Sequence, residues 1–209
     1  MSELSLRAEN LHLWRGERHV LRGLALTVAG GEVLQVTGPN GAGKTSLLRT
    51  LCGLLYLEEG RVLWSGRDVR EDMPAYHGAL VYLGHEPPLK ADLTAAENLR
   101  YWVGLRRRLT ASQAAGALES VGVPGVGGEM VRTLSAGQKR RVALAGLKLL
   151  AAPLWLLDEP TTNLDTEGQG LVGALIEQHV RAGGLAVAAV HHEIRVSPQH
   201  LKRLELSKR

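Results

Sequence analysis

The chain has 209 residues, of which 44% are hydrophobic and 22% are charged, and its formal net charge is +4. This length allows one well-buried domain, or a core with a small appended subdomain, and excludes two full-sized domains. The positive charge does not point to a nucleic-acid partner, because the chain has no phenylalanine and its basic residues are scattered apart from Arg106–Arg108 and the C-terminus.

No apolar run approaches the roughly 20 residues that span a bilayer, and the N-terminal segment lacks the apolar centre of a signal peptide. The single cysteine, Cys52, falls in a predicted helix and can form no internal disulfide, which agrees with a reducing compartment. We therefore expect the protein in the cytosol.

Apolar and polar residues alternate through the first thirty positions, and Gly16, Gly23 and Gly30–Gly31 mark turns, so this region predicts antiparallel strands. The next expected elements are a strand over Val33–Thr37 that ends at a glycine-rich loop, a helix over Lys44–Leu51 that Gly53 ends, and strands over Arg61–Trp64 and Leu80–Leu83.

A helical pattern begins at Thr94. Thr94 and Glu97 have the spacing of a capping box, in which each residue's side chain bonds the other's backbone N–H. Leu99, Val103 and Leu105 fall near one face of the helix that follows, which predicts that this face is buried.

A second helix is expected over Thr110–Val121, and the helical block as a whole spans about Pro87–Ala152. After it come an apolar strand over Leu154–Leu157, a helix over Thr166–Ala182 and a second apolar strand over Leu185–Val190. Apolar strands that alternate with helices are typical of parallel sheets. The predicted fold class is α/β, with a mainly parallel core sheet, an N-terminal antiparallel β-subdomain and an inserted helical subdomain.

The glycine-rich loop fits the pattern G-x-x-x-x-G-K-[ST] between a strand and a helix. It comprises Gly38, Pro39, Asn40, Gly41, Ala42, Gly43, Lys44, Thr45 and Ser46. Glycines let the backbone N–H groups curl around phosphates, the lysine reaches the β- and γ-phosphates, and the threonine places a hydroxyl on Mg²⁺. The loop therefore predicts nucleotide binding; the alternative is a glycine turn with a structural role.

Two carboxylates, Asp158 and Glu159, follow an apolar strand at the end where α/β sheets place their ligands. Adjacent side chains of an extended chain point to opposite sides, so the two acids can serve different purposes. We expect Asp158 to bind Mg²⁺ through water and Glu159 to polarise the water that attacks the γ-phosphate. The alternative is a pair of acids that caps a turn before Pro160.

The run Leu134-Ser135-Ala136-Gly137-Gln138 precedes another helix, whose first amides would form an anion site. Since the chain already has a phosphate loop, a second anion site is explained if it serves the nucleotide held by another copy. Ser135 and Gln138 also have the spacing of a capping box, so a simple helix start is the alternative.

These motifs, with Thr161–Asp165 after the carboxylates, resemble in order and spacing those of the ATP-binding cassette (ABC) ATPases over essentially the whole chain. The resemblance implies a P-loop NTPase fold, with a core at about 1–86 and 153–209 and a helical signature subdomain at 87–152. It implies that Asn163–Asp165 contacts the opposite protomer, that Ser135, Gly137 and Gln138 contact the partner's ATP, and that His191 is the switch histidine. His192 is the competing choice, and a buried structural histidine is the alternative.

The chain departs from the family in two places. The position of the family's Q-loop glutamine corresponds to His85, with Glu86 as its neighbour, and either side chain could face the Mg²⁺ and the water; a plain loop residue is the alternative. The family's aromatic platform for adenine corresponds to Trp14, which could stack on the base, leave that task to Arg15, or fill the core.

The resemblance further implies the cofactors ATP and Mg²⁺, a head-to-tail homodimer across ATP, and a separate membrane permease as partner. Contact with the cytoplasmic face of the inner membrane would run only through that permease, for which Pro87–Trp102 is a candidate surface; its aromatic residues could instead pack the helical block. Within the family, the phosphate-loop, YLGH and LSAGQ segments are most similar to those of the ATP-binding subunits of haem exporters for cytochrome c maturation. Another small ABC exporter or a non-transport ABC ATPase is the alternative.

Overall fold

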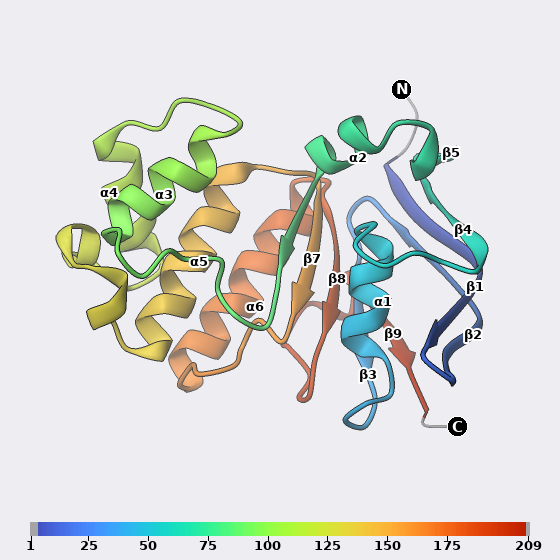
Figure 1. Cartoon of the computed structure of the whole chain (residues 1–209). Helices are drawn as coiled ribbons and strands as arrows, with labels where there is room; N and C mark the ends of the chain where they lie inside the picture. Colours follow the sequence, from blue (N-terminus) through green and yellow to red (C-terminus); the bar gives the residue numbers. More distant parts are fainter. Residues whose placement is uncertain (1–3, 208–209) are drawn as a thin grey trace. The chain divides into compact units, whose positions relative to one another are not determined.

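The computed structural model describes residues 4–207, which form two compact units. The first unit comprises residues up to Tyr82 together with Ala152–Glu159 and the chain from Ile176 onward. The second comprises Leu83–Ala151 and Pro160–Leu175. Residues 160–175 thus group with the helical unit, whereas we had assigned them to the core. Figure 1 shows the elements of both units in chain order.

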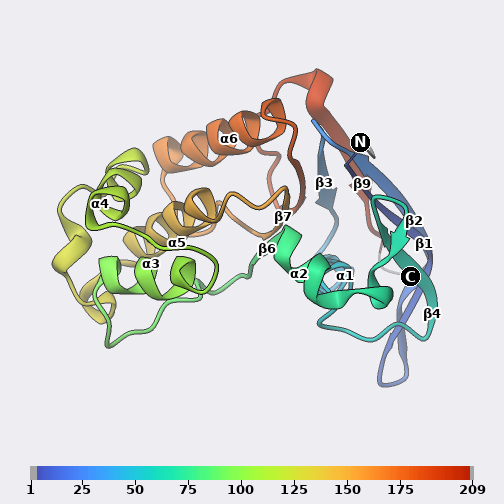
Figure 2. The ribbon, with the colours of Figure 1, turned by 90° about the horizontal axis from the view of Figure 1, so that it is seen from above.

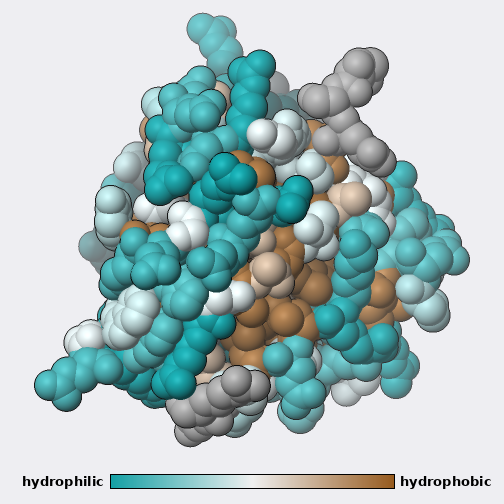
Figure 3. Space-filling view, turned by 90° about the vertical axis from the view of Figure 1, so that its right-hand side faces the viewer, coloured by the Kyte–Doolittle hydropathy of each residue, from teal (hydrophilic) through white to brown (hydrophobic). Residues whose placement is uncertain are grey.

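The first unit contains an antiparallel sheet in the order β2-β1-β4-β5. Its strands are β1 (Ser5–Arg15), β2 (Arg18–Ala29), β4 (Glu59–Trp64) and β5 (Arg67–Asp68). The antiparallel pairing of β1 with β2 confirms the prediction for the first thirty residues. Figure 3 views the molecule from the side on which these strands lie in Figure 1 and shows mainly polar residues around a small apolar area.

The second sheet has the order β6-β7-β8-β3-β9. Its strands are β3 (Val33–Thr37), β6 (Leu80–Leu83), β7 (Leu154–Asp158), β8 (Leu185–Ala189) and β9 (Leu201–Glu205). β7, β8 and β3 pair in parallel, as the apolar runs predicted, and β9, which was not predicted, pairs in parallel with β3. The carboxyl ends of β3, β7 and β8 therefore meet at one edge, where this class of sheet binds its ligands.

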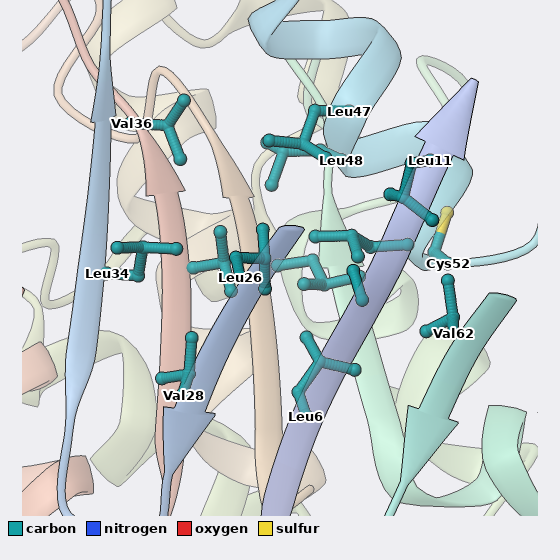
Figure 4. Close-up of a cluster of buried hydrophobic side chains, with 14 of the residues drawn as sticks. Leu6, Leu11, Leu26, Val28, Leu34, Val36, Leu47, Leu48, Cys52 and Val62 are labelled. Atoms are coloured by element: carbon teal, nitrogen blue, oxygen red, sulfur yellow. The ribbon is translucent and has the colours of Figure 1, made fainter. Parts of the chain in front are cut away.

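Helix α1 (Lys44–Leu51) packs its apolar side chains into the main core of the first unit. Figure 4 shows Leu47 and Leu48 of α1 among side chains of both sheets, including Leu34 and Val36 of β3. Because side chains alternate along a strand, Gln35 points to the other face of β3. Cys52 is buried at the C-cap of α1, one residue beyond the helix in which we had placed it.

The second unit contains the helices α3 (Ala95–Gly104), α4 (Ala111–Ser120) and α5 (Ala136–Leu150), which Figure 2 shows beside one another. Each begins with a capping box in which both reciprocal hydrogen bonds are present; the caps are Thr94, Thr110 and Ser135. The short 3-10 turns Val126–Gly128 and Val131–Thr133 lie between α4 and α5. Helix α6 (Thr166–Arg181) begins in this unit and ends in the first.

Some expectations for the elements were incomplete or wrong. Leu105 is 75% exposed, because α3 ends at Gly104 and the residue falls outside the buried face. The structure adds β5, β9, α2 (Met73–Ala79), and the 3-10 turns Val69–Glu71 and Pro198–His200, none of which was predicted. No helix within residues 4–207 has both the length and the apolarity to cross a membrane.

Trp102 packs inside the helical unit, whereas Tyr101 is 52% exposed. A Cβ placed on Gly146 of α5 would lie 2.4 Å from two carbon atoms of the Trp102 ring. We expect Gly146→Ala to lower the free energy of unfolding by about 1–3 kcal/mol, the usual cost of overpacking a core. Chemical denaturation measures this change in the free energy of unfolding, and Gly116→Ala in α4 is the control. Nothing lies within 4 Å of a Cβ at Gly116, so that change should stabilise the chain. Equal effects of the two changes would contradict the close packing of Trp102.

Candidate active site

The phosphate loop follows β3 and leads into α1. Gly38, Gly41 and Gly43 have φ angles of 142°, 77° and 105°, which L side chains rarely adopt. A Cβ on Gly38 would also lie 2.3 Å from the Leu206 carbonyl oxygen. The loop therefore needs glycine at these positions for steric reasons, and its backbone curls as a phosphate cradle requires.

Lys44 is the first residue of α1, and only 6% of it is exposed. Its ammonium group donates hydrogen bonds to the carbonyl oxygens of Gly38 at 2.6 Å and Pro39 at 3.4 Å. No side chain caps the start of α1, at which Gly43 stands. The first amides of the helix and the ammonium group can therefore donate hydrogen bonds to phosphate oxygens.

Asp158 is 1% exposed at the end of β7. The Thr45 hydroxyl donates to its Oδ1 at 3.1 Å, and the Tyr82 hydroxyl donates to its Oδ2 at 3.4 Å. Burial, with the nearby Asp158 charge as a further cause, raises the pKa of Tyr82, so the phenol stays protonated. A hydroxyl and a carboxylate side by side beside a phosphate loop are the oxygen ligands that Mg²⁺ prefers, so the residues fit this cation.

Glu159 lies directly after β7, and its carboxylate contacts the His191 ring. The distance from Glu159 Oε1 to His191 Nε2 is 2.6 Å. We had expected the side chains of Asp158 and Glu159 to point to opposite sides because the chain is extended there. This reason was wrong, since Glu159 has a φ of 50° and is not extended. A left-handed residue turns the chain and directs the carboxylate toward the end of β8. The contact favours His191 over His192 as the partner of the carboxylate.

A cavity of about 520 Å³ joins these groups within the first unit. The phosphate loop, Glu159 and His191 line it, as do Arg15 and Arg18. Arg18 also donates a hydrogen bond to the Gly41 carbonyl oxygen at 2.6 Å. The guanidinium groups of Arg15 and Arg18 and the ammonium group of Lys44 give the cavity the positive charge that suits a polyphosphate.

Trp14 is half-buried, so it does not fill the core as one of our readings supposed. Its ring stacks on His19 with the centroids 3.6 Å apart, and His12 lies next to this pair. Trp14 does not line the 520 Å³ cavity, whereas Arg15 does. The stacking of adenine on Trp14 stays a prediction, with Arg15 as the alternative.

The LSAGQ motif lies in the second unit. The Ser135 hydroxyl accepts a hydrogen bond from the Gln138 amide at 3.2 Å, and the Gln138 side chain accepts one from the Ser135 amide at 2.8 Å. The capping box is therefore real, and it does not exclude a second role for the hydroxyl. A cavity of about 480 Å³ beside it is lined by Ser135, Gly137, Gln138, Arg141 and Asn163–Asp165, among other residues.

Two arginines of α5 that sequence reasoning missed bind other segments of the second unit. Arg141 binds the Asp165 carboxylate at 3.2 Å and so ties α5 to the segment 163–165. Arg140 is 1% exposed and donates to the carbonyl oxygens of Gly84 at 3.1 Å and His85 at 2.7 Å. The side chains of His85 and Glu86 are both exposed, so the geometry does not choose between them. A buried arginine needs such acceptors, but the position of Arg140 within the basic run Lys139–Arg141 gave no sign in the sequence that the residue is buried.

No cluster of three or more His, Cys, Asp or Glu side chains that could hold a metal ion occurs among residues 4–207.

The chain is similar to known proteins over nearly its whole length. The family model described as ABC transporter matches residues 21–162. The cytochrome c biogenesis ATP-binding export protein CcmA of Methylococcus capsulatus is 48% identical, over 94% of this chain and 95% of its own. The protein of the same name from Yersinia pestis is 41% identical, over 97% and 93% of the two chains.

Among solved structures, a putative ABC transporter ATP-binding protein from Pyrococcus furiosus is similar with a TM-score of 0.84 and 25% identity, over 97% of each chain. A bacterial Atm1-family ABC exporter with ATP bound matches with a TM-score of 0.80 and 26% identity, over 92% of this chain and 35% of the exporter. The chain therefore belongs to the ABC transporter family, among the ATP-hydrolysing cytochrome c biogenesis ATP-binding export proteins.

Proposed function

We propose that the chain is the ATP-binding subunit of a haem exporter for cytochrome c maturation and hydrolyses ATP as a head-to-tail homodimer. The observation that carries this is the pairing of Glu159 with His191 at 2.6 Å beside a complete phosphate loop. The family match, which covers residues 21–162 and so includes the phosphate loop and Glu159, supports ATP as the nucleotide of this site. The choice of haem rests on relatives that match over nearly the full length of both chains and are named for cytochrome c biogenesis.

Binding begins at the phosphate loop. Lys44 exchanges the carbonyl oxygens of Gly38 and Pro39 for β- and γ-phosphate oxygens, while the α1 amides take further phosphate oxygens. Thr45 and Asp158 would hold Mg²⁺, which supplies charge that stabilises the transferring phosphoryl group. Tyr82 holds the second carboxylate oxygen of Asp158 and so fixes its orientation.

Glu159 is the group we assign to the attacking water. Its carboxylate accepts the hydrogen bond of the water and orients it for in-line attack on the γ-phosphorus. His191 Nε2 contacts Oε1 of this carboxylate, and His191 is among the residues that line the cavity. This contact restricts the rotamers of both side chains, so the carboxylate is already oriented when the water binds.

The signature residues Ser135, Gly137 and Gln138 would complete the site of a second copy. The start of α5 offers amides and a hydroxyl to the γ-phosphate of the partner's ATP. An ATP-binding cassette of the same fold, at 22% identity, was solved as a dimer bound to ADP and Pi, which supports a dimer. Loss of the γ-phosphate on hydrolysis then removes the bridge between the copies.

The closing and reopening of the dimer would be passed to an integral-membrane permease. This permease would hold the chain at the cytoplasmic face of the inner membrane. Pro87–Trp102 remains our candidate surface for this contact. Trp102 packs within the helical unit, so exposed Tyr101, with the Lys90 ammonium 4.1 Å from its ring centroid, is the aromatic residue left for a partner.

Deletion of the gene in its own host tests the proposal. We expect the deletion strain to lack c-type cytochromes with covalently bound haem, and the wild-type gene to restore them. Lys44→Ala should weaken ATP binding about 10- to 100-fold, through loss of a charge-assisted contact with phosphate, and should fail to restore them. Haem staining of membrane proteins and ATP titration of the purified chain give the two measurements.

Lys202→Ala is the matched control, since it removes an ammonium group from the surface of the same unit, where it pairs with Glu32. It should restore cytochromes like the wild type. Normal c-type cytochromes in the deletion strain would overturn the haem assignment and leave another export substrate or a non-transport ATPase.

A further inference from the structure

Gln35 is a polar residue in the middle of a buried strand. Its exposed fraction is 1%, and it lies between Leu34 and Val36 of β3, which face the main core of the unit. A buried amide costs free energy unless its donor and its acceptor are both satisfied. The partner that satisfies Gln35 therefore indicates why an amide stands here.

That partner is the backbone of Ile194. The Gln35 Nε2 donates to the Ile194 carbonyl oxygen at 2.7 Å, and the Ile194 amide donates to Gln35 Oε1 at 3.0 Å. Both ends of the side-chain amide thus bind both polar backbone groups of one residue. Such a reciprocal pair fixes orientation as well as distance, as a pair of bonds in a sheet ladder does.

Ile194 directly follows a short loop, His191–Glu193, which we call the switch loop. The chain enters it from Val190, whose amide donates to the Val36 carbonyl oxygen at 3.0 Å. All three residues of the loop are exposed, whereas Val190 and Ile194 are 1% and 3% exposed. Adjacent residues of β3 therefore hold both ends of the loop, one through its backbone and the other through its side chain.

We propose that Gln35 is the positioning residue of the switch loop, and that it keeps the His191 ring in contact with the Glu159 carboxylate. The inference rests on the proposed role of that pair in hydrolysis. β3 also leads directly into the phosphate loop, so one strand sets the position of the phosphate cradle and of the histidine. Gln35 itself touches neither nucleotide nor water and acts through the loop.

The first test replaces Gln35 by leucine, which has a similar volume and no hydrogen-bonding group. The full-length chain is assayed for ATP hydrolysis at concentrations that favour the dimer. We expect kcat to fall about 10-fold or more, as when a catalytic group is misplaced by about 1 Å. KM for ATP should change less than about 2-fold, because the phosphate loop keeps its own contacts.

Two controls separate positioning from loss of stability. Val62→Ala truncates a buried side chain in the antiparallel sheet, and it should lower the melting temperature without changing kcat. Gln199→Leu makes the same chemical change at an exposed position of the same unit and should change neither. If Val62→Ala, at a similar loss in melting temperature, lowers kcat as much as Gln35→Leu, Gln35 has only a structural role.

Gln35→Glu supplies a conservative rescue that depends on pH. A protonated carboxyl donates to the Ile194 carbonyl oxygen and accepts from its amide, whereas a carboxylate has no donor. Burial raises the pKa of such a carboxyl, because it disfavours the charged form. The ratio of the variant's kcat to that of the wild type should therefore be near one at low pH and fall as pH rises through that pKa. A ratio that does not change with pH would contradict the reciprocal pair.

Hydrogen exchange at the Ile194 amide tests the inference without hydrolysis. This N–H donates to Gln35, so Gln35→Leu should speed its exchange about 10-fold or more, with exchange in α1 unchanged. If His191→Ala and Glu159→Gln keep wild-type turnover, the proposed function of the pair fails, whatever Gln35 does. If those two changes abolish turnover while Gln35→Leu alters neither exchange nor kcat, the inference about Gln35 fails alone.

Discussion

Glu159→Gln is expected to bind ATP with wild-type affinity, to accumulate as a closed dimer and to hydrolyse ATP at least about 100-fold more slowly than the wild type. Glutamine has the shape of glutamate and can still bond the His191 ring, so the cavity keeps its form. An amide oxygen does not accept the proton of the attacking water. Binding and closure then proceed, and the step that would reopen the dimer does not.

Size-exclusion chromatography with and without ATP measures the dimer, and phosphate release measures turnover. Glu71→Gln makes the same change at an exposed position of the first unit and should behave as the wild type in both measurements. Wild-type turnover by the Glu159 variant would remove Glu159 as the base. Slow turnover without a lasting dimer would instead separate hydrolysis from reopening.

The elements that the sequence predicted well are those with strong local signals. β3, α1 and β6 have the predicted bounds, and the capping boxes that the spacing indicated at Thr94 and Ser135 begin α3 and α5; the box at Thr110 was not predicted. β9 was missed because Leu201–Glu205 carries charged and half-exposed residues, and only its pairing with β3 makes it a strand. α2 was missed because Pro74 and Gly78 give it weak helix propensity, and Asp72 caps it through a bond that the spacing does not reveal.

The candidate site shows the same division between local and tertiary information. The phosphate loop and the position of Asp158 could be read from spacing, because each follows an apolar strand. The left-handed turn at Glu159 could not, since glutamate gives no sign of a positive φ. Gln35 could be suspected as a polar residue in an apolar run, whereas Arg140 stands in the basic run Lys139–Arg141, and the acceptors of both belong to distant segments. Only the fold brings those segments together.

Ser135→Arg is expected to abolish turnover and leave ATP binding by the single copy unchanged. The reason is that Ser135 of one copy would complete the nucleotide site of the other copy. The change also removes a helix cap, which costs about 1 kcal/mol, and places a cation at a helix N-terminus. Two further variants separate these effects. Ser135→Asp keeps the cap but opposes a phosphate with a carboxylate, so it should fold normally and not turn over. Ser135→Thr keeps both cap and hydroxyl and should remain active.

A mixture of two inactive variants gives the decisive measurement. In a dimer of one Ser135→Arg copy and one Lys44→Ala copy, the intact phosphate loop of the first meets the intact LSAGQ motif of the second. Equal amounts should recover up to roughly a quarter of the wild-type turnover, since half of the pairs are mixed and each holds one complete site. Each variant alone should remain inactive. If the mixture stays inactive while both chains fold and exchange partners, the two motifs do not share a nucleotide between copies. Ser135 would then be a helix cap and nothing more.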